Sequence, residues 1–122
     1  MTAPSLRRHR VPHVSRVGLP TSRNRVAAAA LREQRRFRLE QLAELAAADG
    51  AVGGAMDEVR AALREAAEHA LADVTAALER IEAGTYGSCL ACAAPIPAER
   101  LEIVPMAAYC MACQRDREGA WR

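Results

Sequence analysis

The sequence predicts a mainly α-helical protein, in which an antiparallel two-helix coiled-coil hairpin precedes a small C-terminal module with four cysteines. Three observations predict this fold class. First, 28 of the 122 residues are alanine and only four are aromatic; alanine has the highest helix propensity, and such a chain buries little area per residue. Second, two long segments with apolar residues at helical spacing flank a glycine-rich turn. Third, all four cysteines fall in the last third of the chain.

The N-terminus is strongly basic. Residues 1–25 contain six arginines and no acidic residue, whereas the rest of the chain contains 11 arginines and all 15 acidic residues. Pro4, Pro12 and Pro20 interrupt any helix in this segment. We therefore expect a disordered basic tail over residues 1–25, and its composition fits either a solvated segment or a contact with nucleic acid.

Residues 26–84 are predicted to form the hairpin, with its tip near residues 46–54. The first helix, over residues 26–48, contains neither glycine nor proline, and Ser22 or Asn24 is expected to cap it. Its apolar positions recur at helical spacing: Ala28, Leu31, Leu39, Leu42 and Ala46. Three glycines at positions 50, 53 and 54 separate it from the next helix.

The second helix is predicted over residues 55–83, between that turn and the helix-stop residue Gly84. Its apolar residues form an almost unbroken seam: Met56, Val59, Leu63, Ala67, Leu71, Val74, Leu78 and Ile81. Two helices of similar length, each with one apolar stripe, and a short connection between them predict an antiparallel coiled-coil hairpin.

Residues 85–122 are predicted to form a zinc-finger module that ends in a C-terminal helix. Its cysteines follow the spacing C-x2-C-x17-C-x2-C: Cys89, Cys92, Cys110 and Cys113. Two thiolates three residues apart converge on one ion from a tight turn, and two such turns complete a tetrahedron, so the spacing predicts one zinc ion. Four thiolates leave no coordination position for water, which makes this zinc structural and not catalytic. The residues between the two pairs are expected to form short strands and a loop.

Two disulfides or a redox-active Cys-x-x-Cys pair are the alternatives for these cysteines. An intracellular setting disfavours disulfides, and a redox pair needs a thioredoxin-like βαβ context that the sequence lacks. The segment between Cys89 and Cys113 contains only Glu99, Arg100 and Glu102 as charged residues. Because a module that binds phosphates is basic, we do not expect this one to read nucleic acid.

The composition also excludes several other classes of protein. No apolar run approaches the 18 residues of a transmembrane helix, and no apolar stretch follows the N-terminal arginines as it would in a secretory signal. We therefore expect a soluble cytoplasmic protein. Neither a nucleophile–base pair nor an open metal site is visible, so an enzyme is not expected.

A coiled-coil hairpin that leads directly into a four-cysteine zinc module resembles the DksA/TraR family of bacterial RNA polymerase-binding transcription factors. Three segments carry the likeness: ALERIEAGTYGSC at residues 77–89, PIPAERLE at 95–102 and YCMAC at 109–113. The hairpin matches the family in architecture and length, whereas the N-terminal tail does not match it.

The resemblance implies a transcription regulator that binds RNA polymerase and not DNA. Family members insert the coiled-coil tip into the secondary channel, where acidic residues act near the active site. The family's tip pattern, Asp-x-x-Asp-x-Ala, falls on residues 46–51 and implies polymerase contacts for Asp49 and Ala51, with Ala46 in place of the first acid. Asp49 also stands at the C-terminal end of a helix, where the helix dipole disfavours an anion. We expect a monomer that binds no specific DNA sequence directly.

Some relatives also bind the alarmone guanosine tetraphosphate through basic side chains. The corresponding positions are Ala66, Asp73 and Gln114, none of which is basic, so the resemblance implies weak or absent alarmone dependence. A function of a different class stays open: a zinc-stabilised coiled-coil scaffold that binds another protein, or pairs with itself, and does not act on polymerase.

Overall fold

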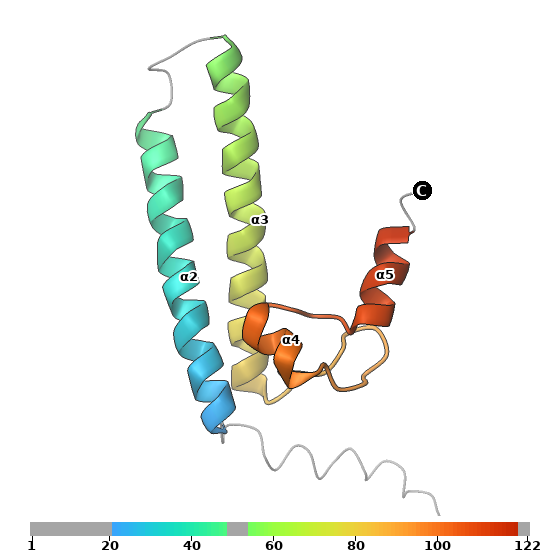
Figure 1. The fold of residues 1–122 in the computed structure, drawn as a ribbon. Coiled ribbons are helices and arrows are strands. Elements are labelled where there is room, and N and C mark those ends of the chain that lie inside the picture. Colours follow the sequence, from blue (N-terminus) through green and yellow to red (C-terminus); the bar gives the residue numbers. More distant parts are fainter. Residues whose placement is uncertain (1–20, 49–53, 120–122) are drawn as a thin grey trace, which may run out of the picture.

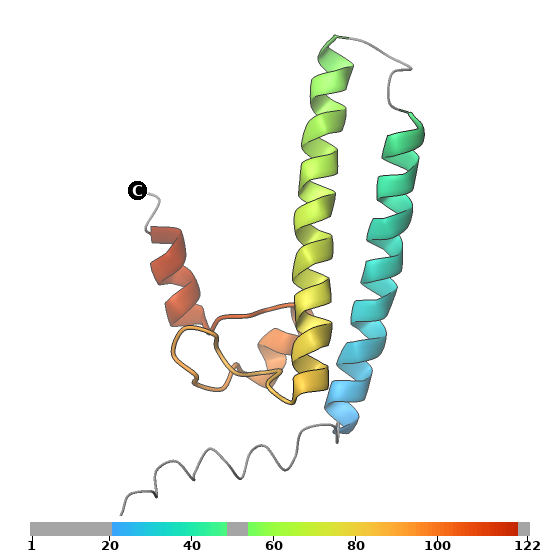
Figure 2. The ribbon, with the colours of Figure 1, turned by 180° about the vertical axis from the view of Figure 1, so that it is seen from behind.

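The computed structural model describes residues 21–48 and 54–119. Within these ranges the chain forms four helices: α2 (Ser22–Ala47), α3 (Ala55–Ala83), α4 (Ala98–Ile103) and α5 (Met111–Gly119). Helices α2 and α3 run side by side as a long antiparallel hairpin, and α4 and α5 lie beside the base of α3 (Figure 1). The view from behind shows the same arrangement, with the tip of the hairpin far from the C-terminal module (Figure 2). The predicted fold class is confirmed.

Helix α2 begins earlier than the sequence predicted. Its N-cap is Thr21, whose side-chain oxygen accepts a hydrogen bond of 3.0 Å from the backbone N–H of Asn24. Residues 22–25 therefore belong to the helix and not to the predicted tail, and the prediction of Ser22 or Asn24 as the cap was wrong. A threonine is itself a favoured N-cap, and no proline follows Pro20 to stop the helix. The rest of the predicted tail, residues 1–20, lies outside the described residues.

The predicted limits of the second helix are confirmed. Helix α3 carries Asp57 and Glu58 in its first turn, where the helix dipole favours acidic residues, and it is capped by Gly84. Gly84 has a φ of 81°, a left-handed conformation that glycine adopts without steric cost. Its N–H donates to the carbonyl oxygens of Arg80 and Ile81, which closes the last turn.

The core of the hairpin lies at its base. Leu31, Val74 and Ala77 are almost completely buried there. Partly buried side chains from α3 and from the segment after it surround them: Leu78, Ile81, Tyr86 and Met106. Nearer the tip the predicted seam is incomplete, because Met56, Val59 and Leu63 are each about half exposed.

The inward positions of α2 follow Leu31 at intervals of seven residues. Arg38 and Leu45 occupy these positions, and both are half-buried. Leu39 stands one residue, or about 100°, further round the helix and is 51% exposed. The assignment of Leu39 to the seam was therefore wrong. The half-buried Arg38 stands at the inward position instead, and its guanidinium donates a hydrogen bond of 2.9 Å to Oε1 of Gln41.

The module contains a helix where the sequence predicted strands. Among its described residues, extended pairing is limited to a single bridge between Ser88 and Pro95. Pro97 instead starts α4, as its carbonyl oxygen accepts hydrogen bonds from the N–H groups of Arg100 and Leu101. The expectation of short strands was wrong because a proline at the N-terminus of a helix needs no N–H partner and has a helical φ. The predicted C-terminal helix is confirmed as α5.

A small core of its own holds the module together and joins it to the hairpin. Cys89, Ile96, Leu101 and Ala107 are buried within it. Met106 reaches from the module into the hairpin core. None of the described helices is both long and apolar enough to cross a membrane.

Candidate functional site

The four cysteines come from two tight turns, as their spacing predicted. In the first turn, the N–H of Ala93 donates to the carbonyl oxygen of Cys89 over 2.9 Å, and the N–H of Cys89 donates to Ala94 over 2.8 Å. In the second turn, the N–H of Gln114 donates to the carbonyl oxygen of Cys110 over 2.8 Å, at the start of α5. Each turn brings its two thiol groups to the same side of the backbone.

The sulfur positions fit one tetrahedral zinc ion. All four Sγ atoms lie within 4.8 Å of one another, and those of Cys92 and Cys110 are 3.9 Å apart. A zinc–sulfur distance of about 2.3 Å in a tetrahedron places neighbouring sulfurs about 3.8 Å apart. A disulfide needs about 2.05 Å, and the four cysteines are free thiols. Cys89, Cys92, Cys110 and Cys113 therefore hold one structural zinc, and all four ligand positions are filled by sulfur.

As free thiols, the cysteines differ in how easily they ionise. Burial of Cys89 opposes ionisation, but hydrogen bonds from the backbone N–H groups of Cys110, Cys92 and Ala91 outweigh it and lower the pKa of Cys89 to about 6. Hydrogen bonds with the sulfurs of Cys110, Cys89 and Cys92 raise the pKa of Cys113 to about 12. Backbone donors directed at a sulfur stabilise the thiolate form that a zinc ligand must adopt.

The predicted tip residues Asp49 and Ala51 lie outside the described residues. The ends of the two helices that lead to them, at Ala48 and Gly54, stand at the far end of the hairpin from the cysteines (Figure 1). Ala46, which replaces the first acid of the tip pattern, lies exposed in the last turn of α2.

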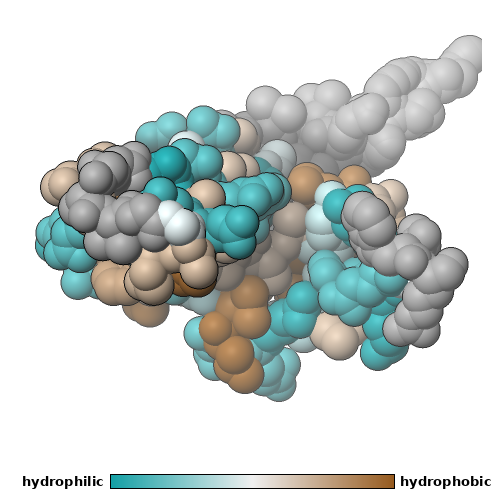
Figure 3. Space-filling model, turned by 90° about the horizontal axis from the view of Figure 1, so that it is seen from above, coloured by the Kyte–Doolittle hydropathy of each residue, from teal (hydrophilic) through white to brown (hydrophobic). Residues whose placement is uncertain are grey.

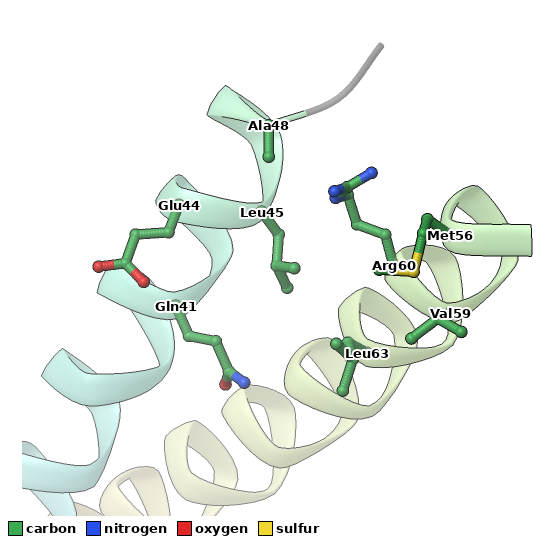
Figure 4. A pocket seen from close by; sticks show the side chains of 8 residues that line it. All are labelled: Gln41, Glu44, Leu45, Ala48, Met56, Val59, Arg60 and Leu63. Atoms are coloured by element: carbon green, nitrogen blue, oxygen red, sulfur yellow. The ribbon is translucent and has the colours of Figure 1, made fainter. Parts of the chain in front are cut away.

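A groove between the two helices lies just below the tip. It has a volume of about 360 Å³, and its wall combines apolar and charged side chains (Figure 4). The residues that line it are Gln41, Glu44, Leu45, Ala48, Met56, Val59, Arg60 and Leu63. We call it the distal groove. Sequence reasoning missed it because the apolar seam of α3 was assigned to the inside of the hairpin.

A second cavity, of about 460 Å³, lies between α3 and the module. It brings together two of the three positions that the resemblance linked to the alarmone, Asp73 and Gln114. The same cavity is lined by three arginines: Arg100, Arg115 and Arg117. The sequence analysis missed them because it considered only the three positions that the resemblance linked to the alarmone.

Two of these arginines are held by Tyr109. The guanidinium of Arg117 lies 4.3 Å from the centre of the Tyr109 ring, and Nε of Arg100 donates to the Tyr109 carbonyl oxygen over 3.4 Å. The acidic residues Asp73 and Glu118 line the cavity as well. The cavity is therefore of mixed charge.

Comparison with known proteins finds matches to the module and to the fold. Residues 84–119 match the prokaryotic dksA/traR C4-type zinc finger. An uncharacterised protein of Aquifex aeolicus is 44% identical over 48 residues, which is 39% of this chain and only a third (33%) of that relative's length. The structure of transcription factor DksA2 from Pseudomonas aeruginosa superimposes with a TM-score of 0.68 at 23% identity, covering 83% of this chain and 87% of that one. At that identity the superposition shows a shared fold.

Proposed function

We propose that this chain is a transcription regulator of the DksA/TraR kind, which binds RNA polymerase and inserts its coiled-coil tip into the secondary channel. The zinc-finger match over residues 84–119 and the shared fold support this proposal. The zinc-finger match supports a transcription-factor-like role. The polymerase as partner, the channel as the binding site and initiation as the affected step are the proposal.

The observation that carries the proposal is the separation of the tip from the module along one arm. Helix α3 has 29 residues, which corresponds to a length of about 43 Å. A slender arm of this length is suited to entering a narrow channel, and the module lies beside its base and not along its length (Figure 1). The core of Leu31, Val74 and Ala77 fixes the direction of the arm at its base.

In this proposal Asp49 is the acidic residue that the arm delivers, and Ala51 contacts the polymerase beside it. Ala46 supplies no second acid, so we expect a weaker effect at the tip than in a chain with both acids. The chain acts without catalysis of its own, because its zinc has a full set of thiolate ligands. It acts in the cytoplasm as a monomer and needs no direct sequence-specific contact with DNA.

The distal groove supports a second candidate function. Its half-exposed Met56, Val59 and Leu63 are apolar side chains of the kind that a partner protein covers. A zinc-stabilised scaffold that binds a protein other than polymerase would use the same surface. Binding to purified polymerase separates the two candidates.

A transcription assay tests the role of the tip. We expect the zinc-loaded chain to change the lifetime of promoter open complexes, and Asp49→Ala to lose this effect while its affinity for polymerase is retained. Asp57→Ala is the matched control, since it removes an exposed acid from the first turn of α3. An equal loss in both variants would argue against a specific role for Asp49.

A further inference from the structure

One side of the hairpin carries two hollows on the same face of α2. The hollow at the base is lined by residues of α2 that include Arg23 and Ala30, together with Leu101 and Glu102 of α4. The distal groove is lined by Gln41 and other residues of α2 further along. Positions 23, 30, 41 and 48 are separated by seven or eleven residues, which places them on one face of an α-helix. We call this side of the hairpin the front flank.

Exposed apolar side chains run along the front flank. On α2, Val26 is 71% exposed and Phe37 is 58% exposed, and Phe37 stands midway between the two hollows. On α3, Met56, Val59 and Leu63 line the distal groove and are about half exposed. Seen from above the tip, hydrophobic side chains gather on one side of the hairpin and on a projection beside it (Figure 3). These exposed side chains offer a strip of apolar surface that another apolar segment of a chain can cover.

The edge of this strip is acidic. Glu40 and Glu44, four residues apart on α2, are both exposed. Glu33, one further exposed acid on this side, already pairs with Arg36 over 3.3 Å. The basal hollow contains one acid, Glu102, and one cation, Arg23. Arg60, a cation in the distal groove, already pairs with Asp57 over 3.5 Å. The front flank is therefore suited to a segment that is both apolar and cationic.

We propose that the front flank binds the chain's own N-terminal segment, residues 1–20. This segment contains no acidic residue and combines apolar residues with four arginines: Arg7, Arg8, Arg10 and Arg16. It leads into Thr21, the N-cap of α2, and thus joins the chain next to the basal hollow. Residues 1–20 span up to about 66 Å when extended, and α2, with 26 residues, is about 39 Å long.

The covalent connection makes even weak complementarity effective. A short tether gives an effective concentration on the order of millimolar, so a contact with a dissociation constant in that range occupies the flank a large part of the time. An occupied front flank is shielded along Val26, Phe37 and the distal groove from any other partner. This inference concerns the chain alone and does not depend on binding to polymerase.

Methyl NMR spectra of the full, zinc-loaded chain test the proposal. The test variant replaces Arg7, Arg8, Arg10 and Arg16 by glutamine. We expect the methyl signals of Val26, Val59 and Leu63 to differ between the native chain and this variant, and the difference to disappear when the salt concentration is raised from about 50 mM to about 500 mM. Glu40→Gln with Glu44→Gln is expected to produce the same changes. The control, Glu65→Gln with Glu79→Gln, removes two exposed acids elsewhere on α3 and is expected to leave these signals unchanged.

Three results would overturn the proposal. The first is the absence of any difference at these methyl groups between the native chain and the arginine variant. The second is a difference that the glutamines at positions 40 and 44 do not reproduce. The third is a set of shifts that vary on dilution of the protein, which would assign the front flank to a second copy of the chain.

Discussion

The hydroxyl of Tyr86 donates a hydrogen bond of 2.8 Å to the carbonyl oxygen of Pro105 and thereby joins the segment directly after α3 to the far side of the zinc module. Tyr86 also packs against the buried residues of both cores. A second link, of 3.5 Å, runs from the Arg80 guanidinium to the carbonyl oxygen of Ala107. These contacts explain how the zinc module and the arm keep one relative orientation.

Removal of this hydroxyl is expected to loosen the joint. Tyr86→Phe leaves the Pro105 carbonyl oxygen without its donor and should lower the free energy of unfolding by about 1 kcal/mol. Denaturant unfolding of the zinc-loaded chain measures this difference. Tyr109→Phe is the control, and an equal loss in both variants would contradict a special role for the Tyr86 bond.

The same tyrosine predicts a loss of stability in alkali. Burial raises the pKa of Tyr86 above its ordinary value of 10.0, against the opposing effect of Arg80. The unfolded chain therefore ionises first, so the contribution of Tyr86 is fully present below pH 10 and is lost as the pH rises beyond it. Unfolding curves measured on both sides of pH 10 should show a steeper decline for the native chain than for Tyr86→Phe. Parallel declines would contradict this assignment.

The hairpin core is expected to respond unequally to substitutions along its seam. Val74 is 1% exposed, and Val74→Ala should cost about 2 kcal/mol of unfolding free energy through lost burial and a cavity. The same helical pattern predicts that Leu63 is buried in the seam, but Leu63 is 47% exposed. Leu63→Ala should therefore lower the free energy of unfolding by less than about 1 kcal/mol. Thermal melting followed by helical circular dichroism compares the two. A larger loss for Leu63→Ala would place the core nearer the tip than the structure has it.

The first cysteine turn offers a stabilising substitution. Ala93 has a φ of 66°, in the left-handed region where a Cβ atom costs about 1 kcal/mol. Ala93→Gly should remove this cost and raise the concentration of chelator needed to release the zinc. Ala94→Gly is the control, since Ala94 has no positive φ. A lower resistance to chelator in Ala93→Gly would show that the turn is not strained there.

Removal of the zinc is expected to unfold the module and to spare much of the hairpin. The module's own core is small, with Cys89, Ile96, Leu101 and Ala107 as its buried residues, so the metal supplies a large part of its folding free energy. Chelation should reduce the helical circular dichroism signal by the part that α4 and α5 contribute. The hairpin should stay helical but melt at a lower temperature. A module that keeps its fold without metal would contradict a structural zinc.

The alarmone is expected to have little effect. Asp73 and Glu118 oppose an anion in the cavity beside α3, and Tyr109 already engages Arg100 and Arg117. Transcription is measured with and without guanosine tetraphosphate, once with this protein present and once with polymerase alone. The alarmone should change transcription by the same amount in both cases. Asp73→Arg supplies a further cation to the cavity and should introduce a response. A clear increase in the native chain's effect on transcription when the alarmone is added would contradict this prediction.

Local patterns in the sequence predicted the two long helices and the metal ligands. Each Cys-x2-Cys pair determines its own turn. Gly54 stands at the start of α3 and Gly84 at its end, and glycine suits both positions because it lacks a Cβ atom. The start of the first helix was misplaced because three residues close together, Thr21, Ser22 and Asn24, can each cap a helix.

Features that depend on contacts between distant residues were missed. Leu39 and Leu63 fit a helical period, but burial depends on how the partner helix is placed, and both are about half exposed. The arginines of the cavity beside α3 come from α4 and α5, and only folding brings them to Asp73. The strands predicted near Pro97 gave way to α4, since a proline fits the start of a helix as well as a loop.

Competitive binding to core RNA polymerase tests the central claim most directly. The zinc-loaded chain is titrated with labelled polymerase, first alone and then with a protein known to occupy the secondary channel. The account predicts saturable binding at micromolar concentrations or below, with displacement by the competitor. Binding that the competitor leaves unchanged, or no binding at all, would contradict insertion into the channel and favour the scaffold function.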